Sequence, residues 1–137
     1  GLVPAMTKRG SGDILIVSSI ASLITMPNSV MYAASKSFVT AYGQSLAAET
    51  ERFGVRVCVL CPGYVHTSLH ERAGLSHLEK QVPRWMWISS DTVVKAGMRG
   101  LRRKKVVVVP GLVYRSVRPF LNSRAAQRLW RQLTKRH

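Results

Sequence analysis

Short runs of aliphatic residues divide the chain into segments with different hydrophobic patterns. Residues 13–19 and 55–60 are mostly β-branched or aliphatic, and residues 105–111 repeat this pattern up to a Pro-Gly pair. Short runs without polar alternation are typical of parallel strands that are buried on both faces. Longer segments suited to helices separate these runs. The pattern therefore predicts an α/β arrangement of three strands with flanking helices.

Three segments are predicted to be helical. Residues 1–10 resemble the end of a helix, and residues 30–53 form a long helix that Gly54 caps. The Ser90-Asp91 pair is expected to N-cap a third helix, which ends near residue 103. Residues 20–29 and 64–88 lie between these elements and are predicted to be a loop and an insert that is rich in aromatic residues.

One apolar stripe runs along the predicted long helix. Phe38, Tyr42 and Leu46 recur at intervals of four residues, which places them on one face. An apolar stripe with this period is typical of a helix face turned toward the core. We therefore expect these three side chains to be buried.

A phenol and an ammonium lie one helical turn apart, at Tyr32 and Lys36. A neighbouring ammonium stabilises the ionised form of a phenol, which favours proton transfer. Ser19 ends the first predicted strand, at the edge of the sheet where ligands bind in open α/β folds. Each residue also has a structural reading, in which Ser19 only ends a strand, Tyr32 packs and Lys36 is solvated.

Three motifs occur in a fixed order along the chain. They are Ser18-Ser19, the Tyr-Ala-Ala-Ser-Lys segment at 32–36, and Pro62-Gly63-x-Val65-x-Thr67. With these motifs, residues 1–110 resemble the C-terminal half of a classical short-chain dehydrogenase/reductase. The resemblance implies an α/β fold, namely the C-terminal part of a Rossmann-type doubly wound parallel sheet with three strands, followed by a basic C-terminal helix.

The resemblance also implies a role for each matching residue. Tyr32 is expected to be the general acid or base and also to contact the cofactor. Ser19 is expected to bind the substrate oxygen, and Lys36 to hold the nicotinamide ribose hydroxyls. The residues expected to line the nicotinamide end are Pro62, Gly63, Val65 and Thr67. The implied cofactor is NAD or NADP, and the implied substrate is a carbonyl compound or alcohol. The aromatic insert, which the family uses as a lid, favours a hydrophobic substrate.

The sequence lacks the Gly-rich turn, of the Gly-x-x-x-Gly-x-Gly type, that cradles the cofactor phosphates in this family. It also begins at Gly1 rather than at a methionine. We therefore expect part of a longer enzyme, which alone binds the cofactor poorly and turns over no substrate. The alternative, from a different class, is a non-catalytic remnant that binds a membrane or a protein partner through its basic residues.

Neither the cysteines nor the histidines form a recognisable site. Cys58 and Cys61 lie three apart in a predicted strand, so their side chains point to opposite faces. A zinc site would need further ligands, and no third cysteine exists. His66, His70 and His77 do not match a ligand pattern either. We predict two small buried cysteines and no metal.

Positive charge is concentrated near the C-terminus. The formal net charge is +15, every acid lies at or before Asp91, and thirteen of the 21 bases follow it. Residues 112–137 combine arginines with leucines and a tryptophan at helical spacing, so we divide the chain into a domain at 1–111 and a basic helical extension at 112–137.

The basic extension suggests two kinds of contact. It is expected either to touch an anionic membrane surface or to pack on its own subunit or a dimer partner. Charge alone would also permit nucleic-acid binding, but no recognised module accompanies it. The resemblance implies a homo-oligomer that forms through the helix at 30–53, with the stripe of Phe38, Tyr42 and Leu46 as the candidate interface. The expected location is the cytoplasm, with peripheral contact with a membrane.

Overall fold

Three parallel strands form the main sheet of the computed structural model, which describes residues 1–26, 29–66, 82–112 and 114–116. The strand order is β1-β2-β5, with bounds β1 (Gly12–Val17), β2 (Val55–Leu60) and β5 (Val107–Val108). β1 pairs with β2 along its whole length, whereas β5 pairs only with the end of β2. Within the described residues, β1 is therefore an edge strand and β2 is central.

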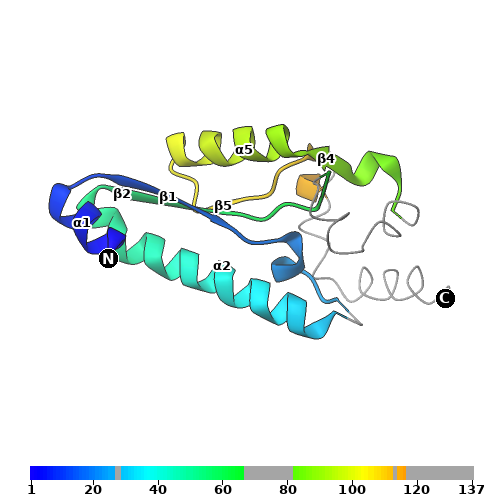
Figure 1. Ribbon diagram of the computed structural model, residues 1–137, viewed down its shortest axis with the longest axis horizontal. Helices are drawn as coiled ribbons and strands as arrows, with labels where there is room; N and C mark the ends of the chain where they lie inside the picture. Colours follow the sequence, from blue (N-terminus) through cyan, green and yellow to red (C-terminus); the bar gives the residue numbers. More distant parts are fainter. Residues whose placement is uncertain (27–28, 67–81, 113, 117–137) are drawn as a thin grey trace.

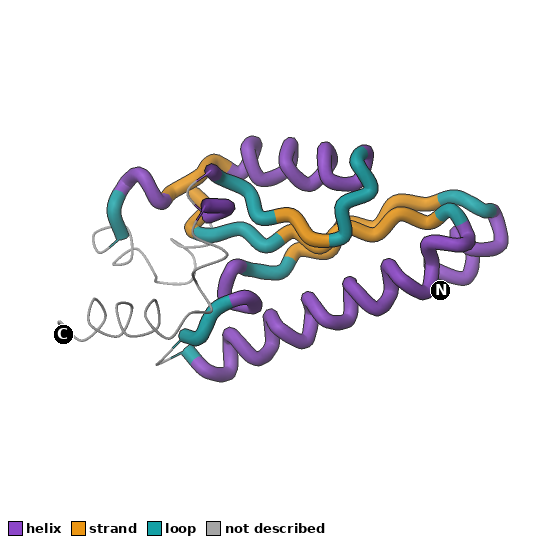
Figure 2. Tube along the Cα trace, turned by 180° about the vertical axis from the view of Figure 1, so that it is seen from behind, coloured by secondary structure: helices purple, strands orange, loops and turns teal. Residues whose placement is uncertain are grey.

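Helices cover both faces of this sheet. α2 (Val30–Thr50) connects β1 to β2, and α5 (Ser90–Arg102) precedes β5. Figure 1 shows α2 and α5 on opposite sides of the sheet, with the short α1 (Leu2–Arg9) beside the start of β1, and Figure 2 shows the same layers from behind. This arrangement confirms the predicted doubly wound α/β fold. No helix in the described part of the chain has the length and apolar content needed to span a membrane.

The core is built around β2. Val59 and Cys61 pack with Val109 and Tyr114 in one cluster, and Ala47 packs with Val55 and Val57 in another. Both clusters lie on the face of β2 that α2 covers, because alternate residues of a strand share a face, while Cys58 and Leu60 face the glycines of α5. Burying this aliphatic surface contributes roughly 25 cal/mol per Å². The central strand thus packs against residues as far apart in the sequence as Ala47 and Tyr114. Tyr114 was predicted to belong to the extension at 112–137 but is part of this core.

The predicted buried stripe of α2 is wrong for two of its three residues. Phe38 is 73% exposed and Tyr42 is 53% exposed, whereas Leu46 is partly buried and packs against the core cluster. The buried residues of α2 are instead small ones: Thr40, Gly43, Ala47 and Thr50. The reason is close packing, since a Cβ on Gly43 would lie 2.4 Å from Val59 Cγ2. Large side chains at this face would hold the helix away from the sheet.

Several short elements were not predicted. A 3₁₀ helix, η1 (Ile20–Leu23), begins directly after β1, where a loop was expected. A second sheet pairs β3 (Tyr64–His66) with β4 (Trp87–Ser89), and η3 (Arg84–Met86) precedes β4. Two helix ends were also predicted: η2 (Glu51–Phe53) extends α2 up to Gly54, as expected, whereas the N-cap of α5 is Ser89 rather than the Ser90-Asp91 pair. The Ser89 Oγ accepts a hydrogen bond from the Thr92 amide at 3.3 Å.

Both cysteines are fully buried, as predicted. The Cys61 Sγ lies 3.8 Å from the Thr40 Oγ1 of α2, whereas the Cys58 Sγ faces Gly100 of α5. The two thiols therefore point to opposite faces of β2 and remain free. Burial, with a smaller contribution from the charge of Cys61, raises the pKa of Cys58 to about 11. Its reactive thiolate form is therefore scarce at neutral pH.

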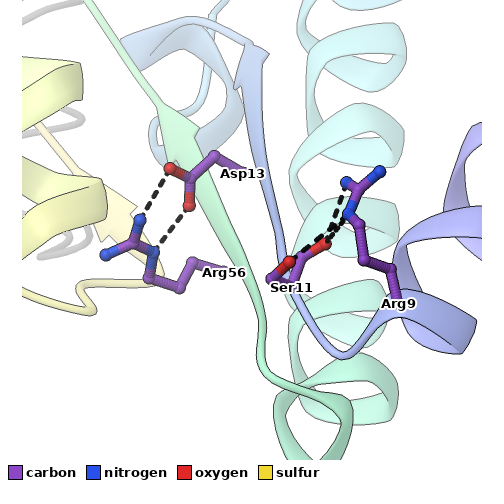
Figure 3. Close-up of polar contacts among 4 residues, drawn as sticks. All are labelled: Arg9, Ser11, Asp13 and Arg56. Atoms are coloured by element: carbon purple, nitrogen blue, oxygen red, sulfur yellow. Dashed lines mark hydrogen bonds and ion pairs between the residues drawn. The ribbon is translucent and has the colours of Figure 1, made fainter.

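A bidentate ion pair marks the start of the β1–β2 ladder. The Arg56 guanidinium donates to both carboxylate oxygens of Asp13 at 2.6 and 2.7 Å, and the two residues are direct cross-strand partners. Figure 3 shows this pair beside Arg9, which binds the backbone and side chain of Ser11. The Asp13–Arg56 pair crosses the two strands and therefore favours the observed register at their amino ends.

Candidate active site

The carboxyl end of β1 is tied to the first half of α2 by Ser18. Its hydroxyl donates to the Lys36 carbonyl oxygen at 3.0 Å and lies 2.8 Å from the Thr40 hydroxyl. A serine has one hydroxyl proton, so Thr40 donates to Ser18 in this arrangement. Ser18 is buried, and its bonds fix the turn of α2 that carries Lys36. Sequence reasoning missed this positioning role, because two adjacent serines give no sign of which one is structural.

Ser19 begins η1. Its Oγ accepts a hydrogen bond from the Ala21 amide at 3.2 Å, and its carbonyl oxygen accepts from the Ser22 hydroxyl at 2.7 Å. Among the described residues the Oγ only accepts, so its proton stays available to a ligand. Ser19 therefore caps a 3₁₀ helix, a structural role other than the strand end that was expected, and keeps the donor that its predicted role would use.

Tyr32 and Lys36 lie on the same side of α2, as their spacing predicts. The Lys36 Nζ lies 5.7 Å from the centre of the Tyr32 ring. Tyr32 is 49% exposed and Lys36 is partly buried. In the described residues Lys36 has no ion-pair partner, so its ammonium protons remain available to ligand hydroxyls. A bond from the Ser37 hydroxyl to the Ser22 carbonyl oxygen, at 3.3 Å, joins this part of α2 to η1.

The Pro62-Gly63 turn lies at the same edge of the sheet. Parallel bonding between the first two strands continues past their ends, since the Ile20 amide donates to the Pro62 carbonyl oxygen at 2.8 Å. Pro62 is therefore beside Ser19. Val65 follows in β3 and pairs with Ile88. Thr67 lies outside the described residues, and so do His70, His77 and residues 117–137.

Tyr114 holds this turn from the far end of the chain. Its ring lies against Gly63, where a Cβ would approach the Tyr114 Cζ to 2.1 Å. Its hydroxyl accepts from the Tyr64 amide at 3.2 Å and donates to the Met86 carbonyl oxygen at 2.6 Å. The glycine is thus required by a packed ring. No sequence signal pointed to Tyr114, since its partners lie 28 to 51 positions away.

Tyr64 shares the electrostatic environment of Tyr32. Burial is the larger cause that raises the pKa of Tyr64, and the charge of an ionised Tyr32 is the second. The ring of Tyr64 lies 5.5 Å from that of Trp87. Tyr64 is therefore a half-buried phenol whose pKa is raised mainly by burial and to a smaller degree by charge on the candidate proton donor.

The structure thus gathers the first two predicted motifs and most of the third around one edge of the sheet. A hydroxyl donor, an exposed phenol and an ammonium meet a Pro-Gly turn at the carboxyl ends of parallel strands, which is where nucleotides bind in open α/β sheets. Such donors suit the hydroxyl-rich ribose of a dinucleotide. The donor set therefore fits a nicotinamide cofactor better than a metal ion.

Comparison with known families agrees with this geometry. A family model described as short chain dehydrogenase matches residues 1–76, which is more than half of the chain. The chain belongs to this family. The matched segment includes Ser19, Tyr32, Lys36 and the Pro62-Gly63 turn.

Two curated relatives of this short chain dehydrogenase show the extent of the similarity. Dehydrogenase/reductase SDR family member 7B of Danio rerio is 44% identical over 68 residues, which is 50% of this chain and 22% of the relative. D-beta-hydroxybutyrate dehydrogenase of Rhizobium meliloti strain 1021 is 33% identical over 113 residues, which is 80% of this chain and 41% of the relative.

A solved structure shows the same fold. The gluconate 5-dehydrogenase of Burkholderia cenocepacia J2315, in complex with NADP and tartrate, superposes with a TM-score of 0.65 at 25% identity. The match covers 82% of this chain and 48% of that one. The chain therefore spans less than half the length of each of these three proteins.

Proposed function

We propose that this chain carries the proton-transfer and nicotinamide-binding part of an NAD(P)-dependent oxidoreductase that interconverts a carbonyl group and an alcohol. The observation that carries the proposal is the placement of Tyr32 and Lys36 on one side of α2, with the Lys36 Nζ 5.7 Å from the centre of the Tyr32 ring. Ser19 lies directly after Ser18, which ties the end of β1 to this helix. Family membership and an NADP-bound relative of the same fold support the choice of cofactor.

Each residue has a defined task in the proposed reaction. In the reducing direction, the Tyr32 Oη gives its proton to the substrate oxygen, and in the oxidising direction it takes the proton back. The Ser19 Oγ donates to the same oxygen and stabilises the negative charge that develops on it. The Lys36 ammonium stabilises the phenolate that remains on Tyr32.

The same residues would hold the cofactor. Lys36 would bind ribose hydroxyls, while Pro62, Gly63, Val65 and Thr67 would line the nicotinamide end. A bound nicotinamide dinucleotide would supply or accept the hydride. Tyr64 and Trp87 border this region and would favour a substrate with apolar groups near the reacting carbon.

The test is a matched pair of tyrosine variants in the complete gene product. Tyr32→Phe removes the transferable proton and should lower kcat by at least about a hundredfold, at unchanged cofactor affinity. Tyr42→Phe alters another exposed tyrosine of the same helix and should leave kcat unchanged. NADH and NADPH oxidation with hydrophobic aldehydes and ketones measures kcat, and calorimetry measures cofactor binding.

Two results would count against the proposal. Turnover by Tyr32→Phe within a few-fold of the unaltered protein would remove Tyr32 from the proton path. No turnover by the unaltered protein would favour the non-catalytic alternative. The 137-residue chain alone is expected to bind NADPH weakly, because its sequence has no Gly-rich phosphate-binding turn; micromolar binding in calorimetry would contradict this expectation.

We also propose that the protein is a homo-oligomer joined through α2. Met31, Phe38 and Tyr42 are large apolar residues that this helix leaves exposed. An exposed apolar stripe on a helix is typical of a protein interface. Two copies of the helix could bury these side chains against each other, which would account for a hydrophobic periodicity that the fold of one copy does not use.

A further inference from the structure

Six cationic side chains lie close together on α5 and the turn that follows it. All six are exposed: Lys95, Arg99, Arg102, Arg103, Lys104 and Lys105. The only acid between residues 90 and 106 is Asp91, at the start of the helix. Among the described residues the ion pair joins Arg56 to Asp13, so none of the six is neutralised there.

The cations of the helix lie on its outer side. The inward side of α5 consists of Val93, Gly97, Gly100 and Leu101, all buried against the sheet. Lys95, Arg99 and Arg102 follow one another at intervals of four and three, which places them together on the opposite side. In Figure 1, α5 is the outer layer on the sheet face opposite α2, so this side of the helix faces away from the sheet.

Exposed aliphatic side chains accompany these cations. Val94 is 56% exposed and Met98, one turn later, is 44% exposed; Val106 follows the basic turn and is 40% exposed. Together with the six cations, these three residues define the basic apolar face. Cations beside exposed aliphatic groups on one helix are typical of elements that lie in a membrane interface.

Simpler explanations account for only part of this face. Bases in the last turn of a helix interact favourably with its dipole. That effect covers Arg99 and Arg102, but not Lys95 in mid-helix or Lys104 and Lys105 beyond the C-cap. A dimer formed through this face about a two-fold axis would bring its positive charges against those of the second copy. Single-stranded nucleic acids are usually bound on aromatic side chains, and residues 90–106 contain none.

We propose that the basic apolar face docks on an anionic membrane surface. The cations would contact lipid phosphates and carboxylates, and Val94 and Met98 would enter the boundary between headgroups and acyl chains. This contact is separate from the predicted membrane contact of residues 112–137. It also goes beyond the oxidoreductase activity and does not depend on it, since the face lies on the outer side of a helix at another part of the molecule.

Vesicle co-sedimentation of the 137-residue chain tests the proposal. The chain should bind phosphatidylcholine vesicles that contain phosphatidylserine, lose affinity as salt rises, and bind pure phosphatidylcholine weakly. Lys95→Gln/Arg99→Gln/Arg102→Gln removes three cations without introducing a poor helix former. At about fivefold per cation, the triple variant should lose about a hundredfold in affinity. Circular dichroism checks that the fold is kept.

A matched triple variant separates this face from the C-terminal extension. Arg124→Gln/Arg128→Gln/Arg131→Gln removes the same charge from the other basic segment. A larger loss in the α5 variant than in this control supports the proposal. Affinity of the α5 variant within threefold of the unaltered chain overturns it, and so does binding that only the control variant abolishes.

The apolar part of the face provides a second test. Met98→Gln keeps every charge, and it should weaken vesicle binding about fivefold without changing the salt dependence. If Met98→Gln has no effect and a single-stranded RNA oligomer displaces the chain from vesicles, the face is a nucleic-acid site and the membrane proposal is wrong.

Discussion

The two helices that cover the sheet both pack on it through glycines, but their solvent-facing side chains differ in chemistry. α2 turns Gly43 toward β2, where a Cβ would lie 2.4 Å from Val59 Cγ2, and α5 turns Gly100 toward β5, where a Cβ would lie 2.6 Å from Val108 Cγ2. Small residues let both helices approach the strands closely. The outer faces then differ: α2 exposes Met31, Phe38 and Tyr42, whereas α5 exposes cations.

This difference separates the requirements of the fold from those of function. The sheet-facing sides of α2 and α5 are alike, because close packing requires only small side chains that fit against the strands. The outward faces and the first turns of α2 are not required by packing, so their chemistry reflects what the protein binds. Each prediction below compares a position on α2 with its counterpart on α5 or on the same helix.

The largest difference is expected between two lysines. Lys36→Met removes the ammonium beside Tyr32 and should lower kcat/KM of the complete gene product by about a hundredfold or more, because phenolate stabilisation and ribose contacts are both lost. Lys95→Met, on α5, should leave kcat/KM unchanged. Equal effects of the two variants in steady-state kinetics would remove the distinction between the helices.

The next largest difference concerns the packed glycines. Gly43→Val forces a branched side chain against fully buried Val59 and should lower the free energy of unfolding by about 2–3 kcal/mol. At Gly97 an added Cβ meets only the ends of two leucines, at 3.0 Å or more. Gly97→Ala should therefore stay within about 1 kcal/mol of the unaltered protein, since alanine favours the helix. Urea unfolding measures both, and similar losses would argue against tighter packing at Gly43 than at Gly97.

A smaller effect is expected on assembly. Phe38→Asp places a charge on the exposed apolar stripe of α2 and should weaken self-association at least about tenfold, as measured by analytical ultracentrifugation. Met98→Asp on α5 should leave self-association unchanged. If assembly depends on Met98 instead, the interface lies on α5, and its assignment to α2 is wrong.

The smallest effect is on the ionisation of Tyr64. Tyr32→Phe removes the charge that helps to raise the pKa of Tyr64, so this pKa should fall. It should remain above that of an ordinary tyrosine, because burial is the larger cause. Titration followed by NMR of ¹³C-labelled tyrosine measures the shift, with Tyr42→Phe as the control. An unchanged Tyr64 pKa would mean that the two phenols do not share a site.

The longer elements could be predicted because several independent signals agreed. Aliphatic runs identified β1 and β2, and Gly54, with φ 71°, ends the helical segment at 30–53 where a left-handed residue was expected. The strand pair β3–β4 and the 3₁₀ helix η1 were not predicted, since three or four residues are too few to show a periodicity. The second sheet exists only because distant segments meet.

Side-chain roles were predictable only where spacing carried the information. Tyr32 and Lys36 could be placed together because four residues make about one helical turn. Of the stripe of Phe38, Tyr42 and Leu46, only Leu46 packs on the core, because periodicity identifies a helix face without saying what covers it. Ser18 and Tyr114 act through partners 18 to 51 positions away, a pairing that only the folded chain displays.

The central claim is that one substrate oxygen meets both Tyr32 and Ser19. A crystal structure of the complete gene product with NADPH and a bound ketone inhibitor tests it most directly. The account predicts that the Tyr32 Oη and the Ser19 Oγ both lie at about 2.6–3.2 Å from the inhibitor oxygen, with Lys36 at the ribose. An inhibitor oxygen beyond hydrogen-bond reach of either hydroxyl would contradict it.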